Sequence, residues 1–408
     1  MSSTPKTFVV TKRLMPDYYP EFHCLMGDCR LSCCQGGWNI DFSRRDYLNI
    51  KQAARGTCIE ALVGGSMRRL RDSEENYARF RLNDAGVCLL QDGDGLCRLQ
   101  LACGERALPT VCREFPRTAV YTPAGYEECS CSTGCEAVLY QLYQRREGLG
   151  FVEEPLAQKR IAEFCISDAL AGIFEPLQEL CIDILQNRRA PLPRRLLMLG
   201  LVLKELDRRV HAEDTQGLEG WLARQRALVE DPSSAEALSA LPGNKPMFLL
   251  NNLDRLIALN PFNHEFRAQK AIILERFQVR WEDGGDRAKA KADLKWYLEA
   301  EQALLNRFGD LDFLFENIMV NNAFFSKFPL TDNCEKIWEN YVTFCSNYSF
   351  FRFFVVSTAP ENEQELIQTL VLASRALLHN HGMTQAVTSK LFQNDSATLA
   401  HMAILVQG

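Results

Sequence analysis

The chain has 408 residues, more than one average domain, and it can bury a large core without disulfides or metals to hold it together. Its net charge of −6, with 24% charged residues, argues against nucleic-acid binding through a basic surface and favours cationic partners such as lysine-bearing surfaces. The N-terminus lacks the apolar segment of a signal peptide, and no run approaches the roughly eighteen apolar residues that cross a bilayer. We therefore expect a cytoplasmic protein without a membrane segment.

Cysteine is the residue type that stands out, because twelve of the 16 cysteines lie in the first third of the chain. A chain of this length does not need them for stability, and thiols stay reduced in the cytosol. A dense cluster therefore predicts metal binding or catalysis rather than a disulfide framework. The leading candidates as metal ligands are Cys24, Cys29, Cys33, Cys34, Cys88, Cys97, Cys112 and Cys135.

Thiolates bind soft metals, and cysteine-only sites suit zinc or iron-sulfur clusters. Adjacent side chains point opposite ways on an extended backbone, so Cys33 and Cys34 do not easily face one metal. Either one of them does not bind the metal directly, or there are two sites. The alternative for the other cysteines is a buried, small apolar side chain. This alternative applies to Cys58, Cys103, Cys129 and Cys131, and most strongly to Cys165, Cys181, Cys334 and Cys345, which lie in helical patterns and are predicted to be core.

The first third of the chain predicts short elements. Residues 1–23 read as an extended lead-in, and Ser43 with Asp46 resembles a capping box that starts a helix over residues 44–54. A helix around 66–72 and a strand around 77–82 follow. Glycines and prolines interrupt residues 88–135, which predicts loops, with a tight turn at 92–95 rather than a calcium loop.

From residue 136 onward apolar residues recur at three- and four-residue spacing, which predicts helices. The predicted helices cover 136–146, 153–186 with interruptions near 172 and 176, 194–209, 215–230, 246–260, 263–279, 286–308, 335–350 and 361–379, with a phenylalanine-rich segment at 310–327. In the last helix the apolar stripe leaves Arg375 and His379 on another face. The fold class predicted is mainly α: a cysteine-rich metal-binding loop module (1–135) at the N-terminus, packed on a large multi-helix lobe (136–408).

Three residues beside the cysteines are candidates for binding. Arg117 could clamp a carboxylate bidentately; the alternative is an ion pair with Glu114 or hydrogen bonds to carbonyls of the cysteine loops. Trp38 and Asp41 could form an aromatic wall and an acid beside a cationic amine. The alternatives for these two are core packing for Trp38 and helix capping for Asp41.

Taken together, the cysteine motifs resemble those of the flagellin lysine-N-methylase family. The matching residues in the first third are Phe22, Cys24, Cys29, Cys33, Cys34, Gly37, Trp38, Ile40, Asp41, Cys88, Asp94, Gly95, Cys97, Gly104, Glu105, Val111, Cys112, Arg113, Phe115, Pro116, Arg117, Cys135 and Ala137. Those in the second half are Glu316, Asn317, Val320, Phe328, Pro329, Ser374, Arg375, His379 and Asn380. The family usually has proline after the last cysteine, where this chain has Glu136.

The resemblance implies transfer of methyl groups from S-adenosylmethionine to surface lysines of flagellin, in a flagellated bacterium. It also implies a cysteine-bound metal centre, a [4Fe-4S] cluster ahead of zinc, with the eight matched cysteines as candidate ligands. Such a centre would either hold the amino and carboxylate ends of the methyl donor or brace the fold. Trp38 and Arg117 are the residues expected to bind the cofactor.

Methyl transfer needs a neutral amine in line with the sulfonium, whereas a free lysine has a pKa of about 10.4. Asp41, Glu114 and Tyr121 neighbour the cysteine motifs and are the candidate proton acceptors. A non-enzymatic metal-binding scaffold and an electron-transfer protein are the alternatives, because the glycine motif of the most familiar methyltransferase fold is missing from the sequence. The sequence leaves the oligomeric state open.

Overall fold

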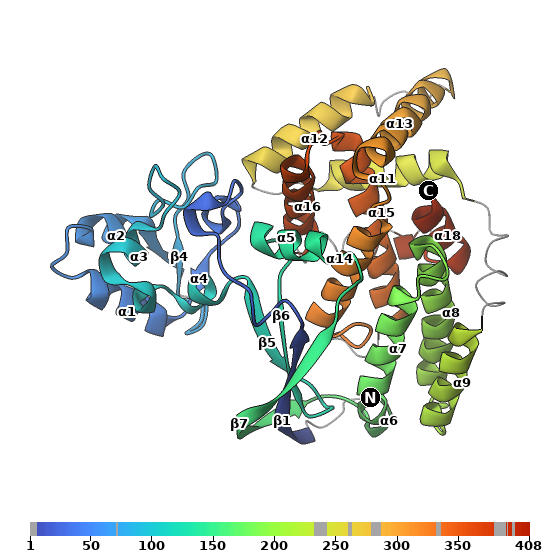
Figure 1. Ribbon diagram of the computed structural model, residues 1–408. Helices are drawn as coiled ribbons and strands as arrows, with labels where there is room; N and C mark the ends of the chain where they lie inside the picture. Colours follow the sequence, from blue (N-terminus) through green and yellow to red (C-terminus); the bar gives the residue numbers. More distant parts are fainter. Residues whose placement is uncertain are drawn as a thin grey trace.

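Helices dominate the molecule, as predicted. The computed structural model describes residues 6–70, 72–231, 243–259, 263–278, 287–331, 336–378, 389, 391–393 and 396–408. Figure 1 shows a small module of short elements on one side, a large group of helices on the other, and a four-stranded sheet between them at one edge.

The small module has its own hydrophobic core, which includes Ile40, Phe42, Ile50, Phe80 and Leu99. A three-stranded antiparallel sheet in the order β2-β4-β3 lies within it. The elements are η1 (Met26–Asp28), η2 (Cys33–Gln35), β2 (Asp41–Phe42), α1 (Arg44–Ala54), α2 (Glu60–Ser66), β3 (Met67–Arg69), β4 (Ala78–Phe80), α3 (Arg98–Cys103), η3 (Glu105–Ala107) and α4 (Thr110–Glu114).

Two predicted elements of this module are confirmed and one is wrong. Helix α1 has the predicted bounds, and the Ser43 hydroxyl accepts a hydrogen bond from the Asp46 N–H at 3.1 Å. The strand predicted around 77–82 is β4. The helix predicted around 66–72 is wrong, because the helix ends at Ser66 and the chain pairs with β4 as strand β3. Pairing with a neighbouring strand outweighs local helix preference here.

The four-stranded sheet has the order β5-β6-β1-β7, formed by β5 (Arg117–Tyr121), β6 (Tyr126–Cys131), β1 (Lys6–Pro16) and β7 (Phe151–Phe164). Strand β1 confirms the extended lead-in, and it pairs parallel with β6 and antiparallel with β7. The hairpin of β5 and β6 was not predicted.

Strand β7 corrects the helix predicted over 153–186, whose first part is extended. Its pairing with β1 runs from Lys6 opposite Phe164 to Pro16 opposite Phe151, with a register shift close to Pro155. Proline has no N–H and is unfavourable inside a helix, but it is tolerated at irregular positions of a strand. Pro155 was therefore the signal against the predicted helix.

The helical lobe confirms most of the remaining predictions. Its helices are α5 (Glu136–Gln144), α6 (Asp168–Gly172), α7 (Phe174–Gln186), α8 (Leu192–His211), α9 (Leu218–Glu230), α11 (Lys245–Ala258), α12 (His264–Arg276), α13 (Arg287–Phe308), α14 (Asp312–Phe325), α15 (Ile337–Thr358), α16 (Glu363–Leu378) and α18 (Leu399–Gln407). Helix α15 extends beyond its predicted end, and α18 was not predicted. Cys181 and Cys345 are buried as expected.

Cys165 is exposed instead of buried, because it lies in the connection between β7 and α6. Cys334, His379 and Asn380 lie outside the described residues. The predicted domain boundary after residue 135 stays a prediction.

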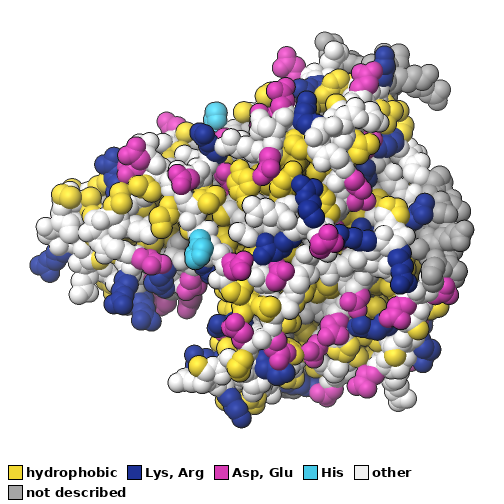
Figure 2. Space-filling model, viewed as in Figure 1, with side chains coloured by type: hydrophobic (Ala, Val, Ile, Leu, Met, Phe, Trp, Pro, Cys, Tyr) yellow, Lys and Arg dark blue, Asp and Glu magenta, His cyan; other side chains and the backbone are white. Residues whose placement is uncertain are grey.

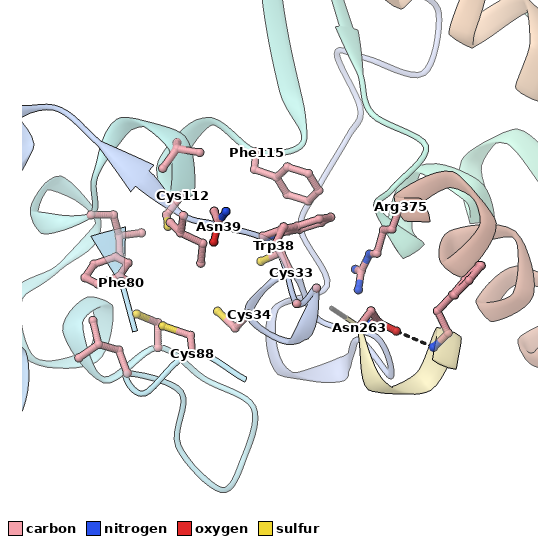
Figure 3. A pocket seen from close by; sticks show the side chains of 18 of the residues that line it. Cys33, Cys34, Trp38, Asn39, Phe80, Cys88, Cys112, Phe115, Asn263 and Arg375 are labelled. Carbon is pink, nitrogen blue, oxygen red and sulfur yellow. Dashed lines mark hydrogen bonds between the residues drawn. The ribbon is translucent and has the colours of Figure 1, made fainter. Parts of the chain in front are cut away.

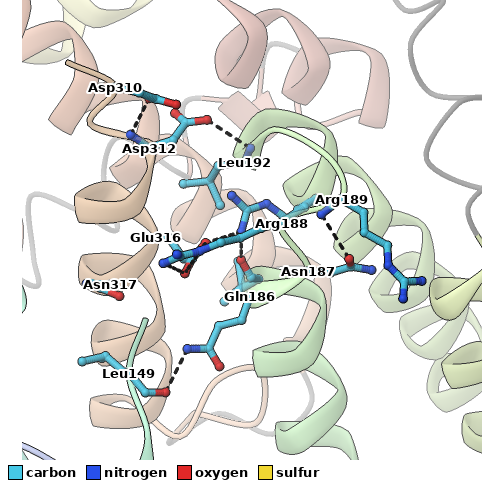
Figure 4. Close-up of polar contacts among 12 residues, drawn as sticks. Leu149, Gln186, Asn187, Arg188, Arg189, Leu192, Asp310, Asp312, Glu316 and Asn317 are labelled. Carbon is cyan, nitrogen blue, oxygen red and sulfur yellow. Dashed lines mark hydrogen bonds and ion pairs between the residues drawn. The ribbon is translucent and has the colours of Figure 1, made fainter. Parts of the chain in front are cut away.

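Two family-matched residues of α14, Glu316 and Asn317, have structural partners, and Figure 4 shows the contact of Glu316 with Arg188. The buried Glu316 carboxylate accepts hydrogen bonds from Arg188, with 2.8 Å between Nη2 and Oε1, and from Arg195 of α8. The Asn317 amide donates to the carbonyl oxygens of Leu142 and Arg145 at 2.9 and 2.7 Å. These contacts fix α14 against α5, α8 and the segment that follows α7.

Charged side chains of both signs are interspersed over the face seen in Figure 2, rather than gathered in one patch of a single sign. Within the described ranges, no helix combines the length and the apolarity that crossing a bilayer requires.

Candidate functional site

A cavity of about 480 Å³ lies where the small module meets the helical lobe. Five of the eight cysteines predicted as ligands line it: Cys33, Cys34, Cys88, Cys97 and Cys112. Figure 3 shows Cys33, Cys34, Cys88 and Cys112 on the module side of the cavity, with Arg375 and Asn263 reaching in from the lobe. Segments more than two hundred residues apart in the sequence therefore meet at one site.

Short local structures position these cysteines. Cys33 and Cys34 open the 3₁₀ turn η2, and the Cys88 N–H donates to the Cys34 carbonyl oxygen at 2.9 Å. Cys97 immediately precedes α3, and Cys112 lies within α4. The turn between Cys88 and Cys97 closes as predicted, because the Asp92 carboxylate accepts the N–H groups of Asp94 and Leu96 at 3.0 and 2.9 Å.

The cavity disfavours negative charge on most of its thiols. Burial raises the pKa of Cys88 to about 11, and it also raises the pKa of Cys97 and of Cys112 above the ordinary thiol value. A hydrogen bond between the Cys33 and Cys34 side chains lowers the pKa of Cys33 and raises that of Cys34. Arg375 lowers the pKa of Cys33 further. These sulfurs become thiolates readily only when positive charge lies beside them.

The other three predicted ligands, Cys24, Cys29 and Cys135, do not line the cavity. Burial, and to a smaller extent the electrostatic influence of Cys135, raises the pKa of Cys29 to about 12. The Cys24 sulfur accepts the Met26 N–H at 3.3 Å. The eight cysteines thus form a group of five at the cavity and a group of three near the start of α5.

Among the residues with described positions, no three His, Cys, Asp or Glu groups are placed to hold one metal ion. The metal-ligand assignment therefore stays a prediction. The donor chemistry of the cavity suits a soft metal centre, because five thiols line one cavity and thiolates are soft ligands.

Aromatic rings form the wall nearest to the lobe. The centroids of the Trp38 and Phe115 rings are 5.3 Å apart, and the Arg375 guanidinium lies 5.0 Å from the Trp38 ring centroid. Asn263 joins the lobe to the module, because its amide donates to the Gln35 carbonyl oxygen at 2.9 Å. Trp38, predicted as a cofactor-binding wall, does face the cavity.

The structure does not bring the predicted acid and base residues to the cavity. Asp41, in β2, is held in an ion pair with Arg79, with 2.8 Å between Oδ2 and Nη2. Glu114 is exposed and lies 3.7 Å from Arg113, and Tyr121 ends β5. None of these three lines the cavity. Their catalytic roles remain untested predictions.

Arg117 makes the kind of carbonyl contact that its alternative interpretation predicts, and its role in cofactor binding stays a prediction. Its Nη2 donates to the Phe22 carbonyl oxygen at 2.9 Å, and its guanidinium lies 4.7 Å from the Phe22 ring centroid. The arginine therefore braces the approach to the cysteine loop. The unmatched cysteines also lie away from the cavity: Cys58 is exposed, the Cys103 thiol donates to the Ala53 carbonyl oxygen, and Cys129 and Cys131 are buried in β6.

Arg375 is the main residue of the cavity that the sequence matched to the family but did not mark as a site residue. It was expected off the apolar stripe of its helix, but only 5% of it is exposed. From Leu366 to Leu377, α16 is almost entirely buried and contains no other charged residue. A lone arginine in an otherwise uncharged stretch of twelve residues, Leu366 to Leu377, was the available signal, because a buried charge needs specific partners.

Comparison with known proteins identifies the family of the chain. The model of the FliB lysine N-methylase C-terminal domain matches residues 178–405. The chain is 27% identical over 169 residues to the lysine-N-methylases of Salmonella choleraesuis (strain SC-B67) and Salmonella typhimurium (strain LT2), covering 37% of this chain and 41% of each relative. It is also 27% identical over 143 residues to the flagellar biosynthetic protein FliU of Salmonella muenchen, covering 34% of this chain and 81% of FliU.

The matched region therefore spans about two fifths of the length of the two lysine-N-methylases. No solved structure shows a significant match. The family model, in contrast, covers more than half of the chain and includes Asn263 and Arg375 at the cavity. The chain belongs to the FliB lysine N-methylase family.

Proposed function

We propose that this protein transfers methyl groups from S-adenosylmethionine to lysine side chains of flagellin, and that the reaction takes place in the cysteine-lined cavity. The observation that carries the proposal is the cavity itself, a concave site with aromatic and thiol walls in a member of the FliB family. The relatives named lysine-N-methylase and flagellar biosynthetic protein support the reaction and the substrate.

The cavity suits a small cationic methyl donor. Its volume lies within the range of about 300–1,000 Å³ that is usual for cofactor sites. The faces of Trp38 and Phe115 offer an electron-rich surface to a sulfonium, which carries a positive charge. Asn39 supplies a polar group that can orient the rest of the donor.

The incoming lysine must lose its proton before it attacks the methyl group. No carboxylate is among the described residues that line the cavity. Apolar surroundings lower the pKa of an amine because they disfavour its charged form. Desolvation by Trp38, Phe115 and Phe266 is therefore the main means proposed, and the proton passes to bulk water as the amine enters the cavity. Asp41, Glu114 and Tyr121 would accept it from outside the cavity.

A [4Fe-4S] cluster is the proposed metal centre, with zinc as the alternative. Cys34, Cys88, Cys97 and Cys112 would hold it, because all four thiols line the cavity within the module and come from separate loops and turns. When bound, an iron with an open coordination position supplies an anchor for the amino and carboxylate ends of the donor, whereas a fully ligated centre only braces the loops.

The test uses the full-length protein purified without oxygen. It is incubated with labelled S-adenosylmethionine and flagellin, and methyl-lysine is measured by mass spectrometry together with iron, zinc and donor affinity. Methylated flagellin and a brown, iron-containing protein are expected. Unmethylated flagellin from a protein with intact metal would overturn the enzyme proposal in favour of a scaffold or an electron carrier.

Single substitutions separate the roles of the metal centre. Cys88→Ser and Cys97→Ser are expected to lose both metal and methylation. Cys58→Ser is the matched control, because this thiol is exposed and away from the cavity. Donor affinity that persists after the metal is lost would rule out direct coordination of the donor by the metal.

A further inference from the structure

Arg375 is a buried cation in the wall of the cavity, on the side of the helical lobe (Figure 3). Its Nε donates to the Gly134 carbonyl oxygen at 2.9 Å. Its two terminal nitrogens donate to the carbonyl oxygens of Ser32 and Leu31 at 3.2 and 2.6 Å. These contacts fix the guanidinium where α16 meets the loop of the small module.

The charge of Arg375 has no full counter-charge beside it. Among the described residues, no carboxylate forms an ion pair with it, and backbone carbonyl groups supply only partial charges. Glu136 does not fill this role, because its Oε2 accepts the Leu31 N–H at 2.9 Å and holds the same loop. A buried guanidinium is costly unless an opposite charge lies close to it. The wall of the cavity therefore offers a place for an anion.

The guanidinium of Arg375 also keeps hydrogen-bonding capacity. Each terminal nitrogen of a guanidinium carries two N–H groups, and each of these nitrogens has one acceptor among the described residues. One N–H on each terminal nitrogen is thus left for a further acceptor. Guanidinium groups bind carboxylates through such pairs of N–H groups. The sequence predicted a carboxylate clamp at Arg117, but that residue does not line the cavity.

The position of Arg375 fits the carboxylate of the proposed methyl donor. The guanidinium lies 5.0 Å from the centroid of the Trp38 ring, which is proposed to receive the sulfonium. In S-adenosylmethionine a short carbon chain joins the sulfonium sulfur to the carboxylate, so a site that holds the sulfur at Trp38 must hold the carboxylate close by. Arg375 is the only charged residue among the described residues that line the cavity.

We propose that Arg375 binds the carboxylate of the methyl donor in the cavity. This inference deepens the proposed function and rests on its placement of the donor. It differs from anchoring by the metal centre, because it assigns the carboxylate to a side chain of the helical lobe. The FliB C-terminal domain, which includes α16, thereby takes part in donor binding together with the cysteine-bearing module.

The test compares S-adenosylmethionine with decarboxylated S-adenosylmethionine, which lacks the carboxylate but keeps the sulfonium. Both are titrated by calorimetry into the full-length protein prepared without oxygen. We expect the wild type to bind the intact donor at least about thirtyfold more tightly, because loss of one partner leaves a buried charge unpaired. Arg375→Gln should bind the two compounds within about threefold of each other.

The ratio of the two affinities separates recognition from structural support. If Arg375→Gln merely loosens the loop of Leu31 and Ser32, both affinities fall together and the ratio stays that of the wild type, which would overturn the proposal. Equal affinities in the wild type would overturn it without any variant. The matched control is Arg255→Gln, which should keep the wild-type ratio, because Arg255 is a buried arginine that donates to Asn347 and does not line the cavity.

A second measurement on the wild type stays decisive if Arg375→Gln folds poorly, as judged by its melting temperature. The two titrations are repeated after the metal has been removed by a chelator. A preference for the intact donor that persists without metal supports Arg375 as the carboxylate-binding residue. A preference that disappears with the metal would assign the carboxylate to the metal centre and overturn the proposal.

The outcomes for Arg375 and for the proposed reaction can be told apart. A wild type that prefers the intact donor, loses this preference in Arg375→Gln and leaves flagellin unmethylated would refute the reaction and support the binding role. A wild type that methylates flagellin, with the same affinity ratio in Arg375→Gln, would refute the binding role alone.

Discussion

Two buried polar regions of this protein differ in how their charges are balanced. Around Glu316, one carboxylate is held by two arginines, so charge and hydrogen bonds are both satisfied within the chain (Figure 4). Around Arg375, a cation has carbonyl partners and thiol neighbours but no carboxylate among the described residues. The first region balances its charges with side chains of the chain itself, whereas the second pairs a full positive charge with the partial charges of backbone carbonyl groups.

The largest expected effect is a loss of stability when the ion pairs of Glu316 are broken. Glu316→Gln leaves Arg188 and the fully buried Arg195 without their acid, which should lower the free energy of unfolding by about 3–5 kcal/mol in urea titrations. Glu205→Gln is the control, because Glu205 pairs with Arg208 and Arg209 at the surface. A loss for Glu316→Gln no greater than that for the control would show that the two buried regions do not differ as argued.

A third buried group, Glu128 of β6, sharpens the comparison because it is an acid with an amide partner, Gln178, at 3.2 Å. Burial raises its pKa to about 8 from an ordinary value of 4.5. The folded protein therefore holds this proton more tightly than the unfolded chain, and stability present below pH 4.5 is lost as the pH rises toward 8.

Glu128→Gln cannot ionise, so relative to the wild type it should gain stability between pH 5 and pH 9. Chemical unfolding at these two values measures the change, and Glu154→Gln on the exposed strand β7 is the control. A difference between variant and wild type that does not change with pH would mean that Glu128 is already ionised in the folded protein.

Part of the fold and of the candidate site could be predicted from the sequence. Local signals were sufficient where a residue acts on its own neighbours, as Ser43 does on Asp46 at the start of α1. The gathering of Cys33, Cys34, Cys88, Cys97 and Cys112 was foreseen because a reduced protein of this length does not need so many thiols for its stability.

Contacts between residues far apart in the sequence could not be predicted from local patterns. Strand β7 is set by its partner β1, which lies more than a hundred residues earlier, and local periodicity misled its prediction. Asp41 was chosen because it is close to the cysteines in sequence, but its fold partner is Arg79 on the neighbouring strand. Arg375 was not marked as a site residue for the reverse reason, because its partners are more than two hundred residues away.

A smaller effect is expected for the aromatic wall beside Arg375. Trp38→Ala should weaken binding of S-adenosylmethionine about tenfold, since a desolvated cation–π contact contributes about 1–2 kcal/mol. Calorimetry measures this, and Trp38→Phe should retain most of the affinity. Trp296→Ala is the control, because that ring packs on Phe277 and Arg276 within the lobe. Unchanged affinity in Trp38→Ala would place the donor elsewhere.

The smallest effect on activity is expected for residues that neighbour the cysteines in sequence but do not line the cavity. Glu114→Gln and Tyr121→Phe should keep the methylation rate within about twofold of the wild type, because substitutions away from a site usually change free energies by no more than about 0.5 kcal/mol. Steady-state rates with flagellin at two donor concentrations measure this. If either variant lost more than tenfold in kcat with donor affinity intact, that residue would reach the amine during the reaction, and desolvation alone would no longer account for the neutral lysine.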